Sequence, residues 1–88
     1  MEVVVGSVVR SIAGHDKGDY FIVLALEDGY AYVADGKLRK AEQPKKKKLK
    51  HIQKSGKIAD DLKLRLDKSE TVENFELRKA LAELVRTN

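Results

Sequence analysis

The residues with the clearest chemistry in this 88-residue chain are lysines. Four of them follow one another directly and two more come soon after: Lys45, Lys46, Lys47, Lys48, Lys50 and Lys54. Ammonium groups gathered this densely can neutralise the phosphates of a nucleic acid and release its condensed counterions. A lysine run can instead be a solvated, flexible tether, because like charges repel one another. Leu49 and Ile52 interrupt the charge and can anchor the segment to a folded domain, which favours the first interpretation.

The distribution of charge separates this segment from the rest of the chain. Residues 1–36 carry two basic and six acidic side chains, which gives a charge of −4. Residues 37–57 carry ten basic side chains and one glutamate, which gives +9, whereas residues 58–88 carry −1. One segment therefore holds more positive charge than the net +4 of the whole chain, which indicates a surface for a polyanion. Charge alone does not separate RNA from DNA.

A second group with chemical potential lies in "AGHDKGD", residues 13–19. Its two glycines permit a tight turn whose backbone N–H groups can face a phosphate, with His15 and Lys17 beside them. The same glycines also serve an ordinary hairpin loop, and the two aspartates of the segment weaken an anion site. Both interpretations stay open at this point.

No grouping of residues indicates catalysis. The chain has no cysteine, which excludes disulfides, thiolate nucleophiles and Cys-ligated zinc. His15 and His51 stand in loop-like or basic contexts, and Asp60 and Asp61 are adjacent, which on a helix directs their carboxylates to different faces. No sequence motif for a nucleophile, a zinc site or a phosphate loop is present. We therefore expect a protein that is not an enzyme and has no cofactor and no metal site.

The elements that must position these residues begin with strands. Residues 3–12 and 20–26 are rich in β-branched and aromatic side chains, and residues 30–34 follow an Asp-Gly pair that favours a tight hairpin turn. After a second Asp-Gly pair, residues 37–43 alternate weakly and could form a short fourth strand. Pro44 excludes a central strand at that point, because it has no N–H to donate. Turn signals every eight to ten residues predict a small antiparallel barrel or sandwich.

Four aromatic residues lie in these strands: Tyr20, Phe21, Tyr30 and Tyr32. We expect most of them to be buried, because a small barrel needs large rings to fill its core. A ring that faces outward near the basic segment could instead stack on a base or a ribose.

The last third of the chain is predicted to be helical. Residues 71–87 place Leu77, Leu81 and Leu84 at helical spacing. Residues 57–70 fit both helical and alternating periods, and we favour a helix. A barrel of about 50 residues is marginally stable alone, so we expect the helical part to pack on it.

This pattern divides the chain into a barrel with the basic segment, residues 1–55, and a helical extension, residues 56–88. The longest apolar run, "YFIVLAL", is far shorter than the roughly 20 residues that span a bilayer. The N-terminal residues lack the basic region and cleavage site of a signal peptide. We therefore expect a cytoplasmic protein that does not interact with membranes.

Taken together, the segment "GSVVRSIAGHDKGDYFIVLAL" at residues 6–26 resembles the KOW motif, in which a strand, a glycine-centred loop and a second strand open an SH3-like barrel. The matching features are Gly6, Val8, Val9, Gly14, the Asp-Lys-Gly tripeptide at 16–18 and the apolar strand from Tyr20. "YVADGKLRK" and the basic stretch after it resemble the continuation in the archaeal and eukaryotic large-subunit ribosomal protein fourteen group and in small bacterial KOW proteins. The likeness covers roughly residues 3–54.

Proteins of this family bind RNA, commonly ribosomal RNA, through the glycine loop and the basic residues around it. The resemblance thus implies a mainly β fold, a small SH3-like (KOW) antiparallel barrel with a C-terminal helical extension, and a ribosome-associated RNA-binding module. Together with the charge pattern it predicts RNA contacts by Arg10, His15, Lys17, Lys37, Arg39, Lys40, Lys45, Lys46, Lys47, Lys48, Lys50, His51 and Lys54. Because solvated lysines contribute little to stability, replacing residues 45–48 is expected to leave folding largely unaffected.

A second class of protein stays open. An SH3-like protein-interaction adaptor would dock an acidic partner on the basic segment and would bind a partner helix or a second copy through its C-terminal leucines. The simpler explanation of the leucines is that they cover the barrel, and we favour it.

Overall fold

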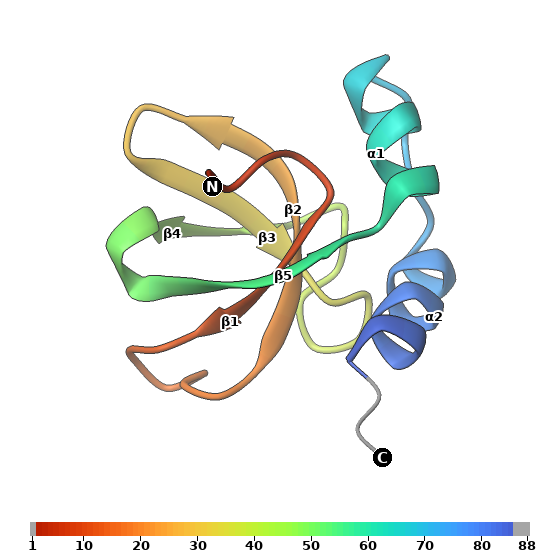
Figure 1. The fold of residues 1–88 in the computed structure, drawn as a ribbon. Coiled ribbons are helices and arrows are strands. Elements are labelled where there is room, and N and C mark those ends of the chain that lie inside the picture. The colour runs from red at the N-terminus through yellow and green to blue at the C-terminus, as the bar shows by residue number, and fades with distance from the viewer. Residues whose placement is uncertain (1, 86–88) are drawn as a thin grey trace.

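The structure, a computed structural model, describes residues 2–85, which form a five-stranded sheet and two helices (Figure 1). In chain order the elements are β1 (Ser7–Ser11), β2 (Tyr20–Glu27), β3 (Tyr30–Ala34), β4 (Lys45–Lys48), the 3₁₀ turn η1 (Leu49–His51), β5 (Ile52–Ile58), α1 (Asp60–Asp67) and α2 (Asn74–Leu84).

The sheet is antiparallel throughout, with the strand order β4-β3-β2-β1-β5. The strands expected at residues 20–26 and 30–34 are confirmed, and the first strand is confirmed in a shorter form that starts at Ser7. A mainly β fold with helices after the sheet is therefore present. β4 and β5 are the two edges of the sheet, and the three residues of η1 connect them directly.

The prediction of a strand at residues 37–43 is wrong, because these residues belong to the loop between β3 and β4. The carboxylate of Asp35 accepts hydrogen bonds from the backbone N–H groups of Lys37 and Arg39, both at 2.8 Å. This closes a turn directly after β3 and prevents an extended continuation. The strand that pairs with β3 is instead the lysine run itself.

The basic segment also ends in a strand that the sequence pattern did not indicate. β5 pairs with β1, and its register shifts where Ser7 and Val9 of β1 lie opposite Ile58 and Lys54. The hydroxyl of Ser55 donates to the carbonyl of Val8 at 2.7 Å within this bulge. β5 thus continues past residue 55, where we expected the barrel to end.

Each face of the sheet carries an apolar cluster. One apolar cluster comes from strands and is supplemented by Val3: Val9, Phe21, Val23, Ala31, Val33 and Ile52. The other combines strand residues with residues from α1, α2 and their connections: Val8, Ile22, Ala34, Ala59, Leu62, Val72 and Leu77. Neighbours such as Val8 and Val9 belong to different clusters because successive side chains of a strand point to opposite faces. The sheet therefore curls over the first cluster, which we call the interior cluster, and the helices cover the second, which we call the helix-covered cluster.

Both predicted helices are confirmed within the described residues, and they lie together on one side of the sheet (Figure 1). Leu77 is fully buried, and Leu81 and Leu84 pack against the same cluster. The end of the helix expected at residues 71–87 lies outside the described residues. Within residues 2–85, no helix has the length and apolar character needed to cross a membrane.

The loop that leads into β4 is held by α2. Gly36 has a φ of +76°, and a Cβ there would lie 2.2 Å from the carbonyl oxygen of Asn74. The guanidinium of Arg78 donates to the carbonyl of Gly36 at 2.6 Å, and the side chain of Asn74 accepts from the N–H of Ala41 at 2.7 Å. Only glycine fits this approach, which positions the start of β4.

Candidate functional site

The side chains of the lysine run in β4 lie alternately on two faces of the sheet. Lys45 and Lys47 lie opposite Val33 and Ala31 of β3, whose side chains are buried in the interior cluster. Lys46 and Lys48 lie opposite Tyr32 and Tyr30, on the outer face. Strand alternation therefore divides the four ammonium groups and prevents them from forming one patch.

The inner lysines belong to a cluster of four side chains, Ser11, Asp16, Lys45 and Lys47, which we call the Asp16 cluster. The carboxylate of Asp16 accepts from Lys45 and Lys47, both at 2.9 Å, and from the hydroxyl of Ser11 at 2.6 Å. Lys47 also donates to the carbonyl of Ala13 at 3.0 Å, and only 6% of it is exposed. These bonds tie the loop between β1 and β2 to β4.

The electrostatics of the Asp16 cluster favour the charged carboxylate. Burial alone would raise the pKa of Asp16, but the hydrogen bonds from Ser11, Lys45 and Lys47 outweigh it and hold this pKa well below its ordinary range. The expectation that residues 45–48 are solvated is therefore wrong for Lys47. Its ammonium group is used inside the protein because the alternating strand places it over the interior.

The loop between β1 and β2 is a closed turn. The backbone N–H groups of residues 17–19 donate to carbonyl groups of residues 11–16 at 2.8 to 3.2 Å. These three N–H groups are therefore bonded within the loop and do not face a ligand. They fit the interpretation of the segment as an ordinary hairpin loop. His15 and Lys17 are exposed in this loop.

The outer side chains of β2, β3 and β4 form two rows across the sheet. Glu27, Tyr30 and Lys48 lie in one row, and Ala25, Tyr32 and Lys46 lie in the next. We call these six residues the β3–β4 face.

The two rows of the β3–β4 face are linked by polar contacts. The ammonium of Lys46 lies 4.5 Å from the ring centroid of Tyr30 and 5.9 Å from that of Tyr32. It also lies 3.4 Å from the carboxylate of Glu27, which accepts from the Tyr32 hydroxyl at 3.2 Å. The phenol of Tyr32 and the carboxylate of Glu27 raise the pKa of Lys46. A cation and two rings thus share one partly exposed surface.

The four strand aromatics take different positions. Phe21 is buried in the interior cluster, and Tyr20 is half-buried against the helix-covered cluster. Tyr30 and Tyr32 keep part of their rings exposed on the outer face. Two of the four aromatic rings therefore stay available for contact with a ligand.

The remaining predicted contact residues fall into three places. Lys37, Arg39 and Lys40 are exposed in the loop before β4, and Lys50 and the half-buried His51 lie in η1 after it. Arg10 and Lys54 line a shallow hollow near the end of α2. Along the chain, exposed cations thus precede, occupy and follow β4. In space Lys37 lines a hollow beside α2, and Tyr20 and Val85 line both this hollow and that of Arg10 and Lys54.

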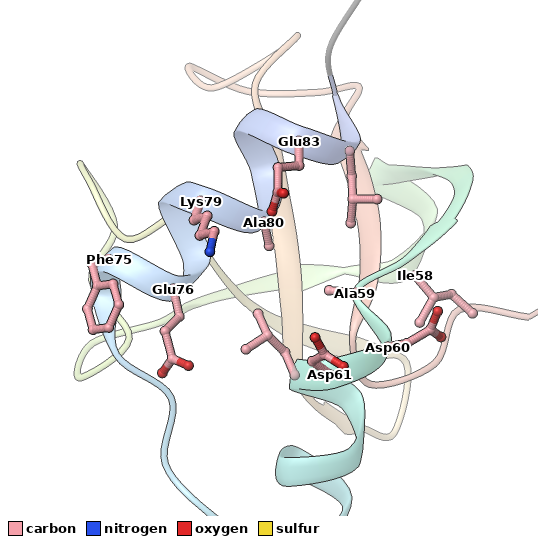
Figure 2. Close-up of a pocket in the computed structure, with 11 residues that line it drawn as sticks. Ile58, Ala59, Asp60, Asp61, Phe75, Glu76, Lys79, Ala80 and Glu83 are labelled. Carbon is pink, nitrogen blue, oxygen red and sulfur yellow. The ribbon is translucent and has the colours of Figure 1, made fainter.

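A groove of about 470 Å³ lies between the start of α1 and α2 (Figure 2). Apolar side chains form part of it, and its polar side chains are Asp60, Asp61, Glu76, Glu83 and Lys79. This excess of carboxylates disfavours an anion such as phosphate. Among residues 2–85, no group of three or more His, Asp or Glu side chains is placed to hold a metal ion.

Comparison with known proteins identifies no family for this chain. No protein-family model matches the chain, and no curated protein matches it significantly. The resemblance to the KOW family stays a prediction.

Proposed function

We propose that this chain is a non-enzymatic, cytoplasmic RNA-binding module of the SH3-like (KOW) type, associated with the ribosome through ribosomal RNA. The observation that carries the proposal is the set of exposed cations in β4 and in the segments that precede and follow it in the chain. They are Lys37, Arg39 and Lys40 before the strand, Lys46 and Lys48 on its outer face, and Lys50 after it.

The sheet supports a barrel of this type. The interior cluster is covered by the sheet itself, and the direct connection through η1 holds the ends of both edge strands close together. A curled sheet whose two edges approach each other is the arrangement that a small, partly open barrel requires.

The mechanism is phosphate neutralisation by a preorganised row of cations. The Asp16 cluster pins β4 to the neighbouring loop, so the outer lysines are presented by a strand and not by a tether. Binding then loses less conformational freedom than the ordering of a flexible lysine tract would cost. Contacts of this kind position RNA without reading its sequence.

The salt dependence of RNA binding tests this proposal. With four or five engaged phosphates, log K against log salt concentration is expected to have a slope of roughly −3 to −4 for single-stranded or irregular RNA. The measurement is a titration of a labelled ribosomal RNA fragment at several salt concentrations. No binding at low salt, or a slope near zero, would remove the proposal.

Matched variants locate the interface. Lys48→Gln and Lys50→Gln are each expected to reduce the magnitude of the slope by about 0.7. Lys68→Gln, an exposed lysine at the end of α1, is the control and is expected to leave the slope unchanged. Equal effects of all three variants would contradict an interface along β4.

The alternative function is a protein-interaction adaptor. The leucines of α2 pack on the sheet, so only the basic surface is left to dock a partner of such an adaptor. Capture of partners from lysate with and without ribonuclease separates the two classes of protein. Loss of the partners on digestion supports RNA binding, and retention supports an adaptor that docks an acidic protein.

A further inference from the structure

The β3–β4 face presents two aromatic rings that can stack only on bases with a free face. Tyr30 and Tyr32 are two residues apart on one strand and point to the same side, so their rings are about 7 Å apart along the strand. Bases stacked in a duplex are separated by only about 3.4 Å. A ring does not fit between bases so close together, and both faces of an interior base of a duplex are already stacked. The unstacked bases of a single strand can lie on the two rings.

Charge on either side of the rings gives the face a direction. Lys46 and Lys48 lie beside the tyrosines on β4, at the edge of the sheet, and Glu27 lies beside them on β2. Glu27 partly neutralises Lys46, whose ammonium lies 3.4 Å away, so phosphates are attracted most strongly to Lys48 at the β4 edge. Bases extend from there over the rings of β3.

The small side chain of Ala25, which is exposed beside Tyr32, adds no bulk next to that ring. The hydroxyl of Tyr32 is held by Glu27, which limits the movement of the ring. An aromatic ring that is fixed before binding loses little freedom when a base stacks on it.

Lys46 occupies the space over the Tyr30 ring in the free protein. An exposed cation–π contact is weaker than the stacking of a base on an aromatic ring. A base can therefore displace the ammonium, whose flexible stem then lets it reach the adjacent phosphate.

From these observations we propose that the β3–β4 face is a stacking platform for single-stranded RNA. Tyr30 and Tyr32 each take one base, and Lys46 and Lys48 neutralise the phosphates beside them. This inference rests on the proposed RNA-binding function and specifies the form of RNA that is bound.

Paired variants test the platform by titration with a labelled, unstructured RNA octamer. Tyr30→Leu and Tyr32→Leu are each expected to weaken binding about tenfold, because the stacked ring is lost. Their salt slope is expected to stay at the wild-type value, because stacking releases no counterions. Tyr30→Phe keeps the ring and is expected to bind within about twofold of the wild type.

Tyrosine fluorescence of the unmodified protein gives a second measurement that does not depend on the folding of a variant. The chain has three tyrosines and no tryptophan. Stacking is expected to quench this emission when the octamer binds, and the duplex form of the same sequence is expected to quench it much less.

The outcomes separate this inference from the function on which it rests. Wild-type affinity in both leucine variants, or equal quenching by duplex and single strand, would overturn the platform even where Lys48→Gln changes the salt slope. Failure of the wild type to bind any RNA at low salt would remove the proposed function together with the platform.

Discussion

Asp16 holds two side chains of the lysine run, Lys45 and Lys47, by hydrogen bonds. Its side chain is 13% exposed and accepts hydrogen bonds from two lysines and a serine. Lys47 is more deeply buried and also bonds a backbone carbonyl, so its charge is compensated without solvent. A buried ammonium that loses its carboxylate partner destabilises a fold strongly, because the remaining charge is uncompensated.

Asp16→Asn is expected to lower the free energy of unfolding by about 2 kcal/mol, since the geometry survives but the charge that compensates Lys47 is lost. Urea denaturation measures the change. Asp28→Asn, in the exposed turn between β2 and β3, is the control and is expected to change stability by less than about 0.5 kcal/mol. Equal stability of the two variants would show that the cluster does not stabilise the fold.

The low pKa of Asp16 predicts that the fold becomes less stable at acidic pH. The pKa of Asp16 is lower in the folded chain than the ordinary value of about 3.9 in the unfolded chain. Its contribution is therefore complete above that ordinary value and is lost as the pH falls toward the lower folded-state pKa. Between pH 6 and pH 3, the free energy of unfolding is expected to fall less for Asp16→Asn than for the wild type, as measured by denaturation at both pH values.

In the proposed platform, Glu27 would oppose RNA binding, because it places a negative charge beside Lys46. Glu27→Gln is expected to tighten binding of the RNA octamer by about twofold to fivefold, because it releases the ammonium and removes repulsion of phosphate. Titration at low salt measures the gain, and the gain is expected to shrink as salt screens the charges. Weaker binding by this variant would place the phosphates elsewhere.

At the scale of elements, β4 is an edge strand made of lysines. Lysines on an edge strand also prevent the sheet from pairing with another copy, so the run has a structural use beside any binding role. Its inner side chains fasten the strand, and its outer ones face solvent and the tyrosines. One short element therefore supplies both the attachment and the charged surface.

The contact between the loop before β4 and α2 depends on Gly36. Gly36→Ala is expected to lower the free energy of unfolding by about 2 to 4 kcal/mol, because the new methyl group collides with a backbone carbonyl. Gly29→Ala is the control: its φ is also positive, at +78°, but no atom lies within 4 Å of the added Cβ. It is expected to cost only about 1 to 2 kcal/mol. Thermal melting of both variants checks the difference.

At the scale of the whole molecule, β4 and the groove between the helices differ in charge. Exposed cations follow β4, whereas the groove between the helices carries mostly carboxylates. Figure 1 shows both helices on one side of the sheet, with the loop that leads into β4 next to α2. Under the proposed function, this difference would favour the approach of RNA to β4 over the groove and would affect the association rate more than the lifetime of the complex.

The sheet and helices share one core, so they are expected to unfold together. Leu77→Ala is expected to lower the free energy of unfolding by about 3 kcal/mol, because Leu77 is fully buried between α2 and the sheet. Leu64→Ala, a 63% exposed leucine on α1, is the control and is expected to change stability by less than about 1 kcal/mol. Separate transitions for sheet and helices, followed by circular dichroism, would contradict a single cooperative unit.

Local sequence patterns determined much of the fold. β2, β3 and both helices were predictable because β-branched runs, Asp-Gly turns and leucine spacing act over a few residues. β4 and β5 were not predictable, because a lysine run has low strand propensity and becomes a strand only by pairing with distant residues. The turn closed by Asp35 replaced the fourth strand that weak alternation had indicated.

For the candidate site, the sequence by itself determined the excess of positive charge between residues 37 and 57 and the presence of aromatic residues near it. Only the tertiary structure decided which lysines are available. Asp16 meets Lys45 and Lys47 across 29 and 31 residues of chain, and this pairing depends on strand register. A shift of one residue exchanges the two faces of a strand, so no local pattern can assign them.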